Sequence, residues 1–316
     1  MQKVTIIIAA YNAEKTIARA VSSALEQTCA PDIIIVDDAS SDDTAAVVEN
    51  MVNGNPRARL LIQSVNQGPS AARNRAIASS KTEWVTPLDA DDAMEPERLE
   101  RMLAIANAEA WDAIADDQYR ISSWAEGATR RRLWSDNDFE KIELNLSIFV
   151  RENIEHYSGF GRELGFIKPI IRRDFLKKHS LAYDESMRLG EDYDLYARML
   201  EHNCRFGLVD PQGYLAFDTP GSLSRAHGSE TLQRLVQSDR RLLANTDLET
   251  QTRGLIKEHL RFNQKKVAIA KFGEAFRERD IRKALSSFIG PPSVIGDLIA
   301  NLFSIARKKI RRMDRV

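Results

Sequence analysis

Clustered carboxylates are the first feature of this 316-residue chain that could do chemistry. The densest group is Asp89-Ala90-Asp91-Asp92, which follows an apolar run and precedes a segment of helical spacing near Pro96. Carboxylate oxygens suit Mg²⁺ or Mn²⁺, and these ions take part of their coordination shell from substrate phosphates. Asp91 or Asp89 could therefore ligate a divalent cation together with a phosphorylated substrate. The alternative is an acidic loop that only caps the next helix.

A second acidic pair, Asp37-Asp38, ends the apolar run of residues 33–36. Acids at the ends of strands in nucleotide-binding folds accept hydrogen bonds from the bound nucleotide. The alternative is again a helix cap, for example through Ser40, but a cap needs only one carboxylate. The pair is therefore interpreted as a contact to a base or a ribose.

Three acids, Glu191, Asp192 and Asp194, open the helix predicted over residues 192–202. Negative charge is favourable at a helix N-terminus, so capping is a reasonable alternative, although it does not require three carboxylates. One of them could be a general base that removes the proton of an attacking hydroxyl. Spacing alone does not choose among the three.

Residues 68–75 combine a glycine, several small residues and two arginines, Arg73 and Arg75. Small side chains permit close approach of the backbone to a ligand, and a guanidinium matches the geometry of phosphate oxygens. The alternative is a surface helix with solvated arginines. The neighbouring acidic groups favour the interpretation as part of a nucleotide site.

The elements that must position these residues alternate between two periods. Four apolar runs predict buried strands: residues 4–10, 33–36, 60–62 and 83–88. Segments of helical spacing separate them, which predicts an α/β fold with a mostly parallel sheet flanked by helices. Ligands of such sheets bind at the carboxyl ends of the strands, where Asp38 and Asp89 fall.

Beyond residue 112 the pattern is less regular. We expect strands over residues 113–121 and 166–171, and a helix over residues 136–151. Few strand signals follow, so the chain is predicted to consist of a site-bearing domain, residues 1–225, and a helical C-terminal region, residues 226–316.

Composition limits the class of protein. A net charge of −1 gives no field that would recruit nucleic acid, and two cysteines, Cys29 and Cys204, fit a reducing compartment. No segment has the ~20 consecutive apolar residues of a spanning helix, so a cytoplasmic protein is expected. The five histidines show no metal-site spacing, although His227 could reach a metal from the loop that precedes it.

Together these motifs resemble the family-2 inverting glycosyltransferases with the GT-A fold. The matching segments are IIIAAYN (6–12), IVDDAS (35–40), GPSAARN (68–74), LDADD (88–92) and, as the family's later acidic motif, GEDY (190–193). Five motifs in the right order are far more specific than any one of them, and the resemblance covers about residues 1–225. The chain is also similar to bacterial exopolysaccharide glycosyltransferases of the succinoglycan type.

The resemblance implies a role for each matching residue. Asp91 would ligate the Mg²⁺ or Mn²⁺ that bridges the donor diphosphate, and Asp192 would be the catalytic base, with Glu191 contacting the acceptor or the donor. Tyr11 and Asp38 would meet the nucleotide base, and Asp89 the ribose or the waters of the metal. The full nucleotide-binding set is Ala10, Tyr11, Asp38, Gly68, Arg73, Asp89 and Ala90.

The reaction that the resemblance implies is inverting transfer of a sugar from a nucleotide-diphosphate sugar, by default UDP-glucose. The acceptor would be a hydroxyl of a saccharide or lipid-linked saccharide in surface polysaccharide biosynthesis. The chain lacks the Q-x-x-R-W motif of processive synthases, which favours addition of one sugar per encounter.

Two other functions stay open. The same fold could be a nucleotide-sugar-binding module without transfer, or a sugar nucleotidyltransferase that makes the activated sugar. The pair Glu191-Asp192 argues against the first. Residues 11–14 are not a glycine-rich triphosphate loop, which argues against the second.

The C-terminal tail carries a further hypothesis. Apolar residues recur at helical spacing over residues 299–313, and basic residues crowd the last ten positions. A basic amphipathic helix suits the anionic surface of a membrane, so peripheral membrane contact is possible through this segment. The alternative is a packed helix followed by a solvated tail.

Overall fold

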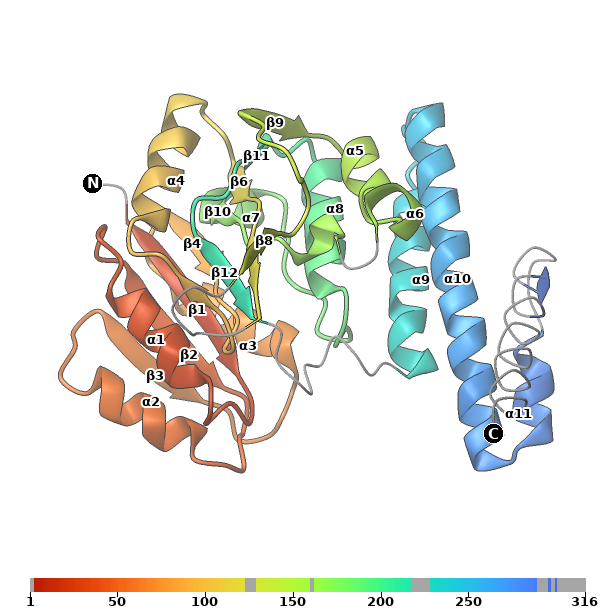
Figure 1. Ribbon diagram of the computed structural model, residues 1–316, viewed down its shortest axis with the longest axis horizontal. Helices are drawn as coiled ribbons and strands as arrows, with labels where there is room; N and C mark the ends of the chain where they lie inside the picture. Colours follow the sequence, from red (N-terminus) through yellow and green to blue (C-terminus); the bar gives the residue numbers. More distant parts are fainter. Residues whose placement is uncertain are drawn as a thin grey trace. The chain divides into compact units, whose positions relative to one another are not determined.

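The computed structural model describes residues 3–122, 129–159, 162–217, 228–288, 295–296 and 299. The chain forms two compact units, Met1–Ser222 and Leu223–Val316. All of the described strands belong to the first unit, and the described part of the second unit is helical (Figure 1). His227 and almost all of the proposed membrane segment lie outside the described residues.

The main sheet of the first unit has eight strands in the order β3-β2-β1-β4-β10-β6-β11-β9. The strands that share one direction are β1 (Val4–Ala10), β2 (Asp32–Asp37), β3 (Ala58–Ile62), β4 (Trp84–Pro87), β6 (Ala113–Asp116) and β11 (Phe206–Val209). Only β10 (Ile170–Arg172) and the edge strand β9 (Lys141–Leu144) run antiparallel to their neighbours. The prediction of a mostly parallel sheet is confirmed.

Helices cover both faces of this sheet because consecutive side chains of a strand point to opposite faces. Ile6 and Ile8 of β1 belong to a buried cluster on one face, whereas Ile7 packs with Ala72 and Ala76 on the other. The first cluster includes residues of α1 (Ile17–Leu25), α2 (Thr44–Val52) and α4 (Arg98–Ala108), and the second includes residues of α3 (Pro69–Ser79) (Figure 1). Burial on both faces explains why the strands are continuously apolar.

A second, four-stranded sheet corrects one expectation. Its order is β5 (Ala93–Met94), β12 (Tyr214–Phe217), β7 (Tyr119–Ile121) and β8 (Arg130–Arg132). Residues 113–121, expected as one strand, form β6 in the main sheet and β7 in this one. The chain changes sheets at Asp117, whose carboxylate accepts hydrogen bonds from the backbone N–H groups of Trp134 (2.9 Å) and Ser135 (3.0 Å).

Two other expectations about the irregular middle of the chain are wrong in detail. The helix predicted over residues 136–151 is only α5 (Leu146–Arg151), which begins where Asn145 Oδ1 accepts the N–H of Ile148 (2.8 Å). The residues before it form β9, because pairing with β11 outweighs their helical spacing. The strand predicted over residues 166–171 is shortened to β10, because Pro169 has no N–H to donate to a ladder.

Four short elements and one longer helix complete the described part of the first unit. They are α6 (Glu155–Ser158), the 3₁₀ turn η1 (Leu164–Phe166), α7 (Arg173–Lys178) and α8 (Glu191–Glu201), together with the strand β5 given above. The helix predicted over residues 192–202 corresponds to α8.

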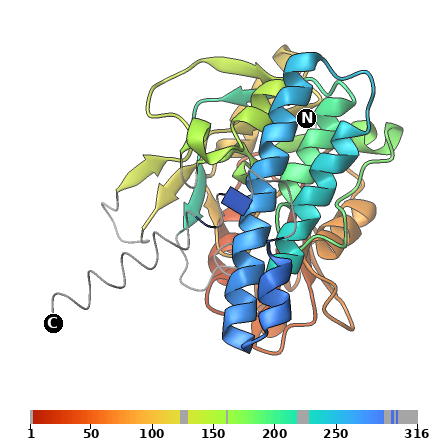
Figure 2. The same cartoon turned by 90° about the vertical axis from the view of Figure 1, so that its right-hand side faces the viewer.

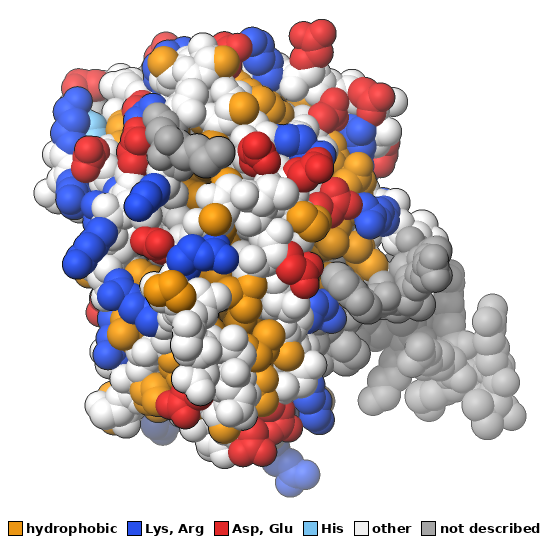
Figure 3. Space-filling model, turned by 90° about the vertical axis from the view of Figure 1, so that its left-hand side faces the viewer, with side chains coloured by type: hydrophobic (Ala, Val, Ile, Leu, Met, Phe, Trp, Pro, Cys, Tyr) orange, Lys and Arg blue, Asp and Glu red, His pale blue; other side chains and the backbone are white. Residues whose placement is uncertain are grey.

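On the face shown in Figure 3, basic and acidic side chains are interspersed, as expected for a chain of net charge −1.

The second unit contains α9 (Ser229–Leu243), α10 (Thr250–Glu278) and α11 (Ile281–Ser286). α9 and α10 lie side by side (Figure 2), and a buried polar group joins them: Asp239 contacts His259 Nδ1 (2.8 Å) and accepts a hydrogen bond from Asn263 Nδ2 (3.0 Å). The predicted helical C-terminal extension is confirmed for the described residues. None of the described helices is long and apolar enough to cross a membrane.

Candidate active site

The polar residues that follow β1, β2 and β4 lie at one edge of the main sheet, because neighbouring parallel strands end on the same side. Tyr11 follows β1, Asp38 follows β2 and Asp89 lies two residues after β4. The backbone N–H of Asp38 donates to the carbonyl of Ala10 (2.8 Å), which joins the first two ends. The structure thus brings together residues that the sequence separates by almost eighty positions.

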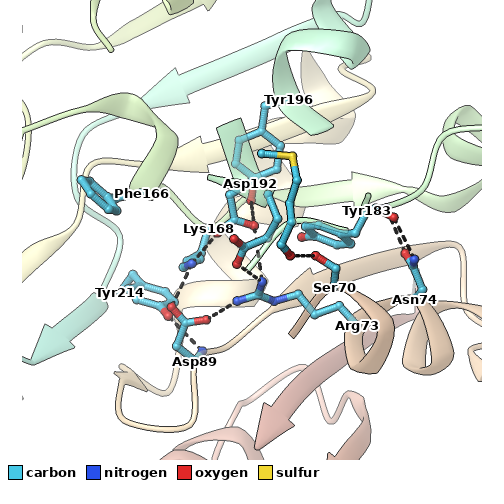
Figure 4. A network of polar contacts seen from close by, with 12 residues as sticks. Ser70, Arg73, Asn74, Asp89, Phe166, Lys168, Tyr183, Asp192, Tyr196 and Tyr214 are labelled. Carbon is cyan, nitrogen blue, oxygen red and sulfur yellow. Dashed lines mark hydrogen bonds and ion pairs between the residues drawn. The ribbon is translucent and has the colours of Figure 1, made fainter. Parts of the chain in front are cut away.

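Five charged side chains meet at this edge, and we call them the charged cluster: Arg73, Asp89, Lys168, Glu191 and Asp192 (Figure 4). Arg73 of α3 bridges Asp89 Oδ1 (2.9 Å) and Glu191 Oε1 (2.7 Å). Lys168 Nζ bridges Asp89 Oδ2 (2.8 Å) and Asp192 Oδ2 (2.7 Å). Each cation therefore links the end of β4 to the start of α8.

The start of α8 separates the three acids that spacing alone could not distinguish. Gly190 adopts a left-handed conformation (φ 71°) just before the helix, which glycine does at little cost. Glu191 and Asp192 then face the charged cluster, whereas Asp194 is paired with Arg198 Nη2 at 2.7 Å on its own helix. The candidates for a base are thereby reduced to Glu191 and Asp192.

Three members of the charged cluster, Asp89, Lys168 and Arg73, have pKa values that favour the ionised form because opposite charges outweigh burial. Burial would raise the pKa of Asp89, but Lys168 and Arg73 lower it to about 2. Burial would lower the pKa of Lys168, but Asp192 and Asp89 raise it above its ordinary value, and the pKa of Arg73 is raised by the same carboxylates and Glu191. Two fixed cations and three acids therefore share one site.

The other two acids of the loop after β4, Asp91 and Asp92, are not members of the charged cluster. The carboxylate of Asp92 accepts hydrogen bonds from Tyr214 Oη (2.9 Å) and the N–H of Phe217 (2.9 Å), which attaches the loop to β12. The carbonyl of Asp91 accepts a hydrogen bond from Arg19, and its side chain is partly exposed. Asp92 thus has a structural role, whereas the side chain of Asp91 is partly accessible to solvent.

The carboxylates of the described residues fit a divalent cation whose coordination shell is completed by a substrate. Among the described residues no group of three or more His, Cys, Asp or Glu side chains could hold a metal. Both oxygens of Asp89 contact cations, which leaves Asp91 as the carboxylate of this loop suited to a metal. Mg²⁺ and Mn²⁺ accept one or two carboxylates when phosphates complete the shell.

Most of the hydrogen-bond acceptor positions of the Asp38 carboxylate are occupied by donors of the protein itself. It is buried, and it accepts hydrogen bonds from the backbone N–H groups of Gln67 (2.8 Å) and Gly68 (2.7 Å) and from the side chain of Gln63 (2.5 Å). Gly68 presents its N–H from a left-handed conformation (φ 95°). A carboxylate has about four acceptor positions, and donors of the described residues occupy three of those of Asp38.

Tyr11 differs from its neighbours in exposure. Its side chain is 47% exposed directly after β1, while Ala10 is buried in the strand. A single exposed aromatic ring at the ligand-binding edge of a parallel sheet is suited to stacking on a flat group. The side-chain Oδ1 of the adjacent Asn12 (φ 48°) accepts the backbone N–H of Ser41 (2.8 Å), which fixes the turn.

Sequence reasoning missed Lys168 and the tyrosines around the charged cluster. Tyr196 Oη donates to Asp192 Oδ1 (3.3 Å), and Tyr183 lies against Arg73, with the guanidinium carbon 5.4 Å from the ring centre. Lys168 precedes a proline in an irregular segment, where neither periodicity nor motif gives a signal. Helical spacing places Tyr196 on the same face as Asp192, which could have indicated that contact.

Comparisons with known proteins show which family and which relatives the chain resembles. Residues 5–165 match the family model described as Glycosyl transferase family 2. The chain is 34% identical over 308 residues to the succinoglycan biosynthesis protein ExoU of Rhizobium meliloti (strain 1021), covering 98% of this chain and 89% of that protein. It is 31% identical over 297 residues to ExoO of the same strain, covering 93% and 83%.

Two solved structures share the fold at low sequence identity. S. aureus TarS (residues 1–349), solved in complex with UDP-GlcNAc, has a TM-score of 0.65 and 18% identity, with 90% of each chain covered. The mannosyltransferase PcManGT from Pyrobaculum calidifontis, solved in complex with GDP-Man and Mn²⁺, has a TM-score of 0.57 and 15% identity. The latter comparison covers 98% of this chain and 82% of that one.

Proposed function

Because the chain belongs to glycosyl transferase family 2 and has the GT-A fold, we propose that it catalyses inverting, metal-dependent transfer of one sugar to an acceptor hydroxyl. The donor is a nucleotide-diphosphate sugar. The observation that carries this proposal is the buried Asp192, which the charged cluster holds beside Asp89 at the ligand-binding edge of the sheet. The proposed base, Asp192, and the proposed donor-binding carboxylate, Asp89, thus contact the same ammonium group of Lys168.

In the proposed reaction, Asp192 removes the proton of the acceptor hydroxyl as its oxygen attacks the anomeric carbon. Attack comes from the face opposite the leaving nucleoside diphosphate, so a single displacement inverts the configuration. Glu191 is fixed by Arg73 (2.7 Å) and is proposed to contact acceptor or donor. A Mg²⁺ or Mn²⁺ held through Asp91 would neutralise negative charge on the diphosphate.

The nucleotide is proposed to lie along the ends of β1, β2 and β4. Tyr11 stacks on the base, the remaining acceptor position of Asp38 receives a base N–H, and Asp89 meets the ribose. Ala10, Gly68, Arg73 and Ala90 complete the set that lines the nucleotide. UDP-glucose is the proposed donor, and UDP also occurs in the sugar nucleotide bound to TarS.

We further propose that the product belongs to exopolysaccharide biosynthesis, as the names of ExoU and ExoO suggest for those relatives. The acceptor is a saccharide or a lipid-linked saccharide, and residues 1–225 form the catalytic part. The enzyme is proposed to act in the cytoplasm. The helical region, residues 226–316, is proposed to reach the inner membrane surface or a partner.

The experiment that tests this function measures release of nucleoside diphosphate by the purified full-length chain. A panel of nucleotide sugars is incubated with Mn²⁺, Mg²⁺ or EDTA, with and without lipid extracts as a source of acceptor. Release from one donor, lost in EDTA, is the expected result. Binding without release under every condition would contradict the proposal and favour a binding module. Synthesis of a nucleotide sugar from a nucleoside triphosphate and a sugar 1-phosphate, with release of pyrophosphate, would favour a nucleotidyltransferase.

The stereochemistry is tested with the same preparation. The configuration of the transferred sugar is read from the anomeric proton coupling of the product by NMR. Inversion relative to the donor is expected, because the charged cluster offers Asp192 as a base and the proposed reaction has one displacement. Retention of configuration would contradict that mechanism while leaving sugar transfer itself intact.

A further inference from the structure

Lys168 occupies a position that the proposed chemistry does not yet explain. Its side chain is 7% exposed, and its ammonium contacts both Asp89 and Asp192, at 2.8 and 2.7 Å (Figure 4). A lysine is rarely buried unless it is paired, and here it is paired twice. The two carboxylates come from different elements, the loop after β4 and the first turn of α8.

The backbone of Lys168 is fixed by a second ion pair beneath the site. Arg98 Nη2 donates to the carbonyl of Lys168 (2.7 Å) and to Asp116 Oδ1 (2.7 Å), and Arg98 Nε donates to the same Asp116 oxygen (3.0 Å). Both side chains of this pair are fully buried. The other oxygen of Asp116 accepts the N–H of Gln212 (2.9 Å). The ammonium of Lys168 is therefore presented from a rigid support.

Lys168 is a fixed positive charge and not a proton donor. Burial lowers its pKa, but the charges of Asp192 and Asp89 outweigh burial and raise the pKa above the ordinary value for lysine. The group is therefore an ammonium at neutral pH. Its effect on a reaction must come from where its charge stands.

The contacts of Asp192 show what that charge does. Lys168 holds Oδ2 at 2.7 Å, whereas among the described residues Oδ1 has the long contact to Tyr196 Oη (3.3 Å) and lies 3.9 Å from Arg73 Nη1. A carboxylate with one oxygen tightly paired presents the other to a ligand. Without Lys168, the carboxylate of Asp192 would keep no contact shorter than 3.3 Å to a side chain in the described part of the protein, while Asp89 would still be held by Arg73 (2.9 Å).

We propose that Lys168 is the positioning residue for the base of this enzyme: it fixes Asp192 Oδ2 and thereby directs Oδ1 toward the acceptor hydroxyl. This inference rests on the proposed function. In the transfer step the acceptor O–H bond breaks, its proton passes to Asp192 Oδ1, and the acceptor oxygen bonds to the anomeric carbon as the nucleoside diphosphate departs. Lys168 donates no proton and remains an ammonium throughout.

The test compares Lys168→Met, Lys168→Ala and Lys168→Arg with the wild-type enzyme in the transfer assay. Lys168→Met keeps the length of the side chain without its charge, so kcat should fall roughly 10- to 100-fold, part of what a positioned base supplies. The donor KM should change less than about threefold, because Arg73 still holds Asp89. Lys177→Ala, which removes an exposed lysine on α7, is the matched control and should keep wild-type kcat.

Chemical rescue separates positioning from a merely structural role. Ethylammonium or propylammonium ions should restore part of the kcat of Lys168→Ala, and tetramethylammonium at the same ionic strength should not. Lys168→Arg should retain more activity than Lys168→Met. Thermal unfolding of each variant reports whether the fold is kept, and Lys168→Met carries the test if the alanine variant does not fold.

The outcomes distinguish this inference from the proposed function. If the wild-type chain transfers sugar but Lys168→Met keeps its kcat, or loses kcat and donor affinity equally without rescue, Lys168 does not position the base and the function stands. If the wild-type chain transfers no sugar from any donor, the proposed function itself is wrong, and with it the positioning role.

Discussion

Asp192 and Asp194 lie two positions apart on α8, yet their carboxylates contact different partners. Asp194 is fully buried against Arg198, and only Asp192 reaches the charged cluster. We therefore expect Asp192→Asn to lower kcat by about 10²–10⁴-fold, because an amide cannot take the proton from the hydroxyl group of the acceptor substrate. Initial rates of transfer measure this, with binding of the donor followed by calorimetry.

The donor affinity of Asp192→Asn should stay close to that of the wild type, because Asp89 and Tyr11 remain. Asp174→Asn, which changes an 87% exposed acid on α7, is a suitable control and should behave as wild type. Near-wild-type kcat in Asp192→Asn would assign the base elsewhere, with Glu191 as the next candidate. Glu191→Gln would then be the variant to measure.

Asp91 gives a second prediction at the scale of single residues. Because the oxygens of Asp89 are held by Arg73 and Lys168, we expect the metal to depend on Asp91. In Asp91→Asn, affinity for the nucleotide sugar should fall and should no longer respond to Mn²⁺ or EDTA. Calorimetric titration of the donor with and without metal measures both effects. A metal response equal to that of wild type would remove Asp91 from the metal site.

At the scale of elements, the ion pair Arg98–Asp116 joins α4, β6 and the residue before Pro169. We expect Arg98→Met to lower the free energy of unfolding by about 3–5 kcal/mol, because it leaves the buried Asp116 charge without its partner. Urea unfolding followed by circular dichroism measures the loss. Arg101→Met, on the exposed face of the same helix, should change stability by less than about 1 kcal/mol.

A loss in Arg98→Met no larger than in Arg101→Met would mean that Asp116 finds other partners. The backbone N–H groups of Gln212 and Tyr214 already contact its second oxygen, so they are the groups that would compensate. The transfer activity of folded Arg98→Met, compared with that of the wild type, would then measure how far the position of Lys168 depends on the Arg98–Asp116 ion pair.

The elements that the sequence predicted are those whose signals are local. Apolar runs that alternate along the sequence with segments of helical spacing predict β1, β2 and β4. The geometry of parallel sheets then places the acids that follow these strands at one edge. The insertion of β10 between β4 and β6 depends on a pairing across more than eighty residues, which no local pattern encodes. Lys168 was missed for the same reason, because its function arises from where β10 is placed.

At the scale of the whole molecule, the C-terminal region gives a prediction about membranes. Phe276, Ile281 and Leu285 are 78, 76 and 66% exposed, and the basic segment of the last ten residues follows them in sequence. We expect the full-length chain to float with vesicles that contain anionic lipid, and deletion of residues 296–316 to reduce flotation. Both proteins are compared with neutral vesicles as the control.

Equal flotation of the two proteins would show that residues 296–316 are not needed for membrane contact. Since the proposed catalytic residues Glu191 and Asp192 lie in the first compact unit, the deletion should keep its rate of donor hydrolysis within about threefold of the full-length chain in solution. A large loss of hydrolysis would instead assign the tail a role in the catalytic unit.

The position of β10 has a consequence for how the chain is made. β4 pairs on one side with β1 and on the other with β10, which begins more than eighty residues later. At a synthesis rate of about 5–20 residues per second, β4 leaves the ribosome roughly 4–17 s before its second partner exists. Throughout that interval a buried, apolar strand is an open sheet edge, so the nascent chain is exposed to aggregation at that strand until Lys168 and β10 have emerged.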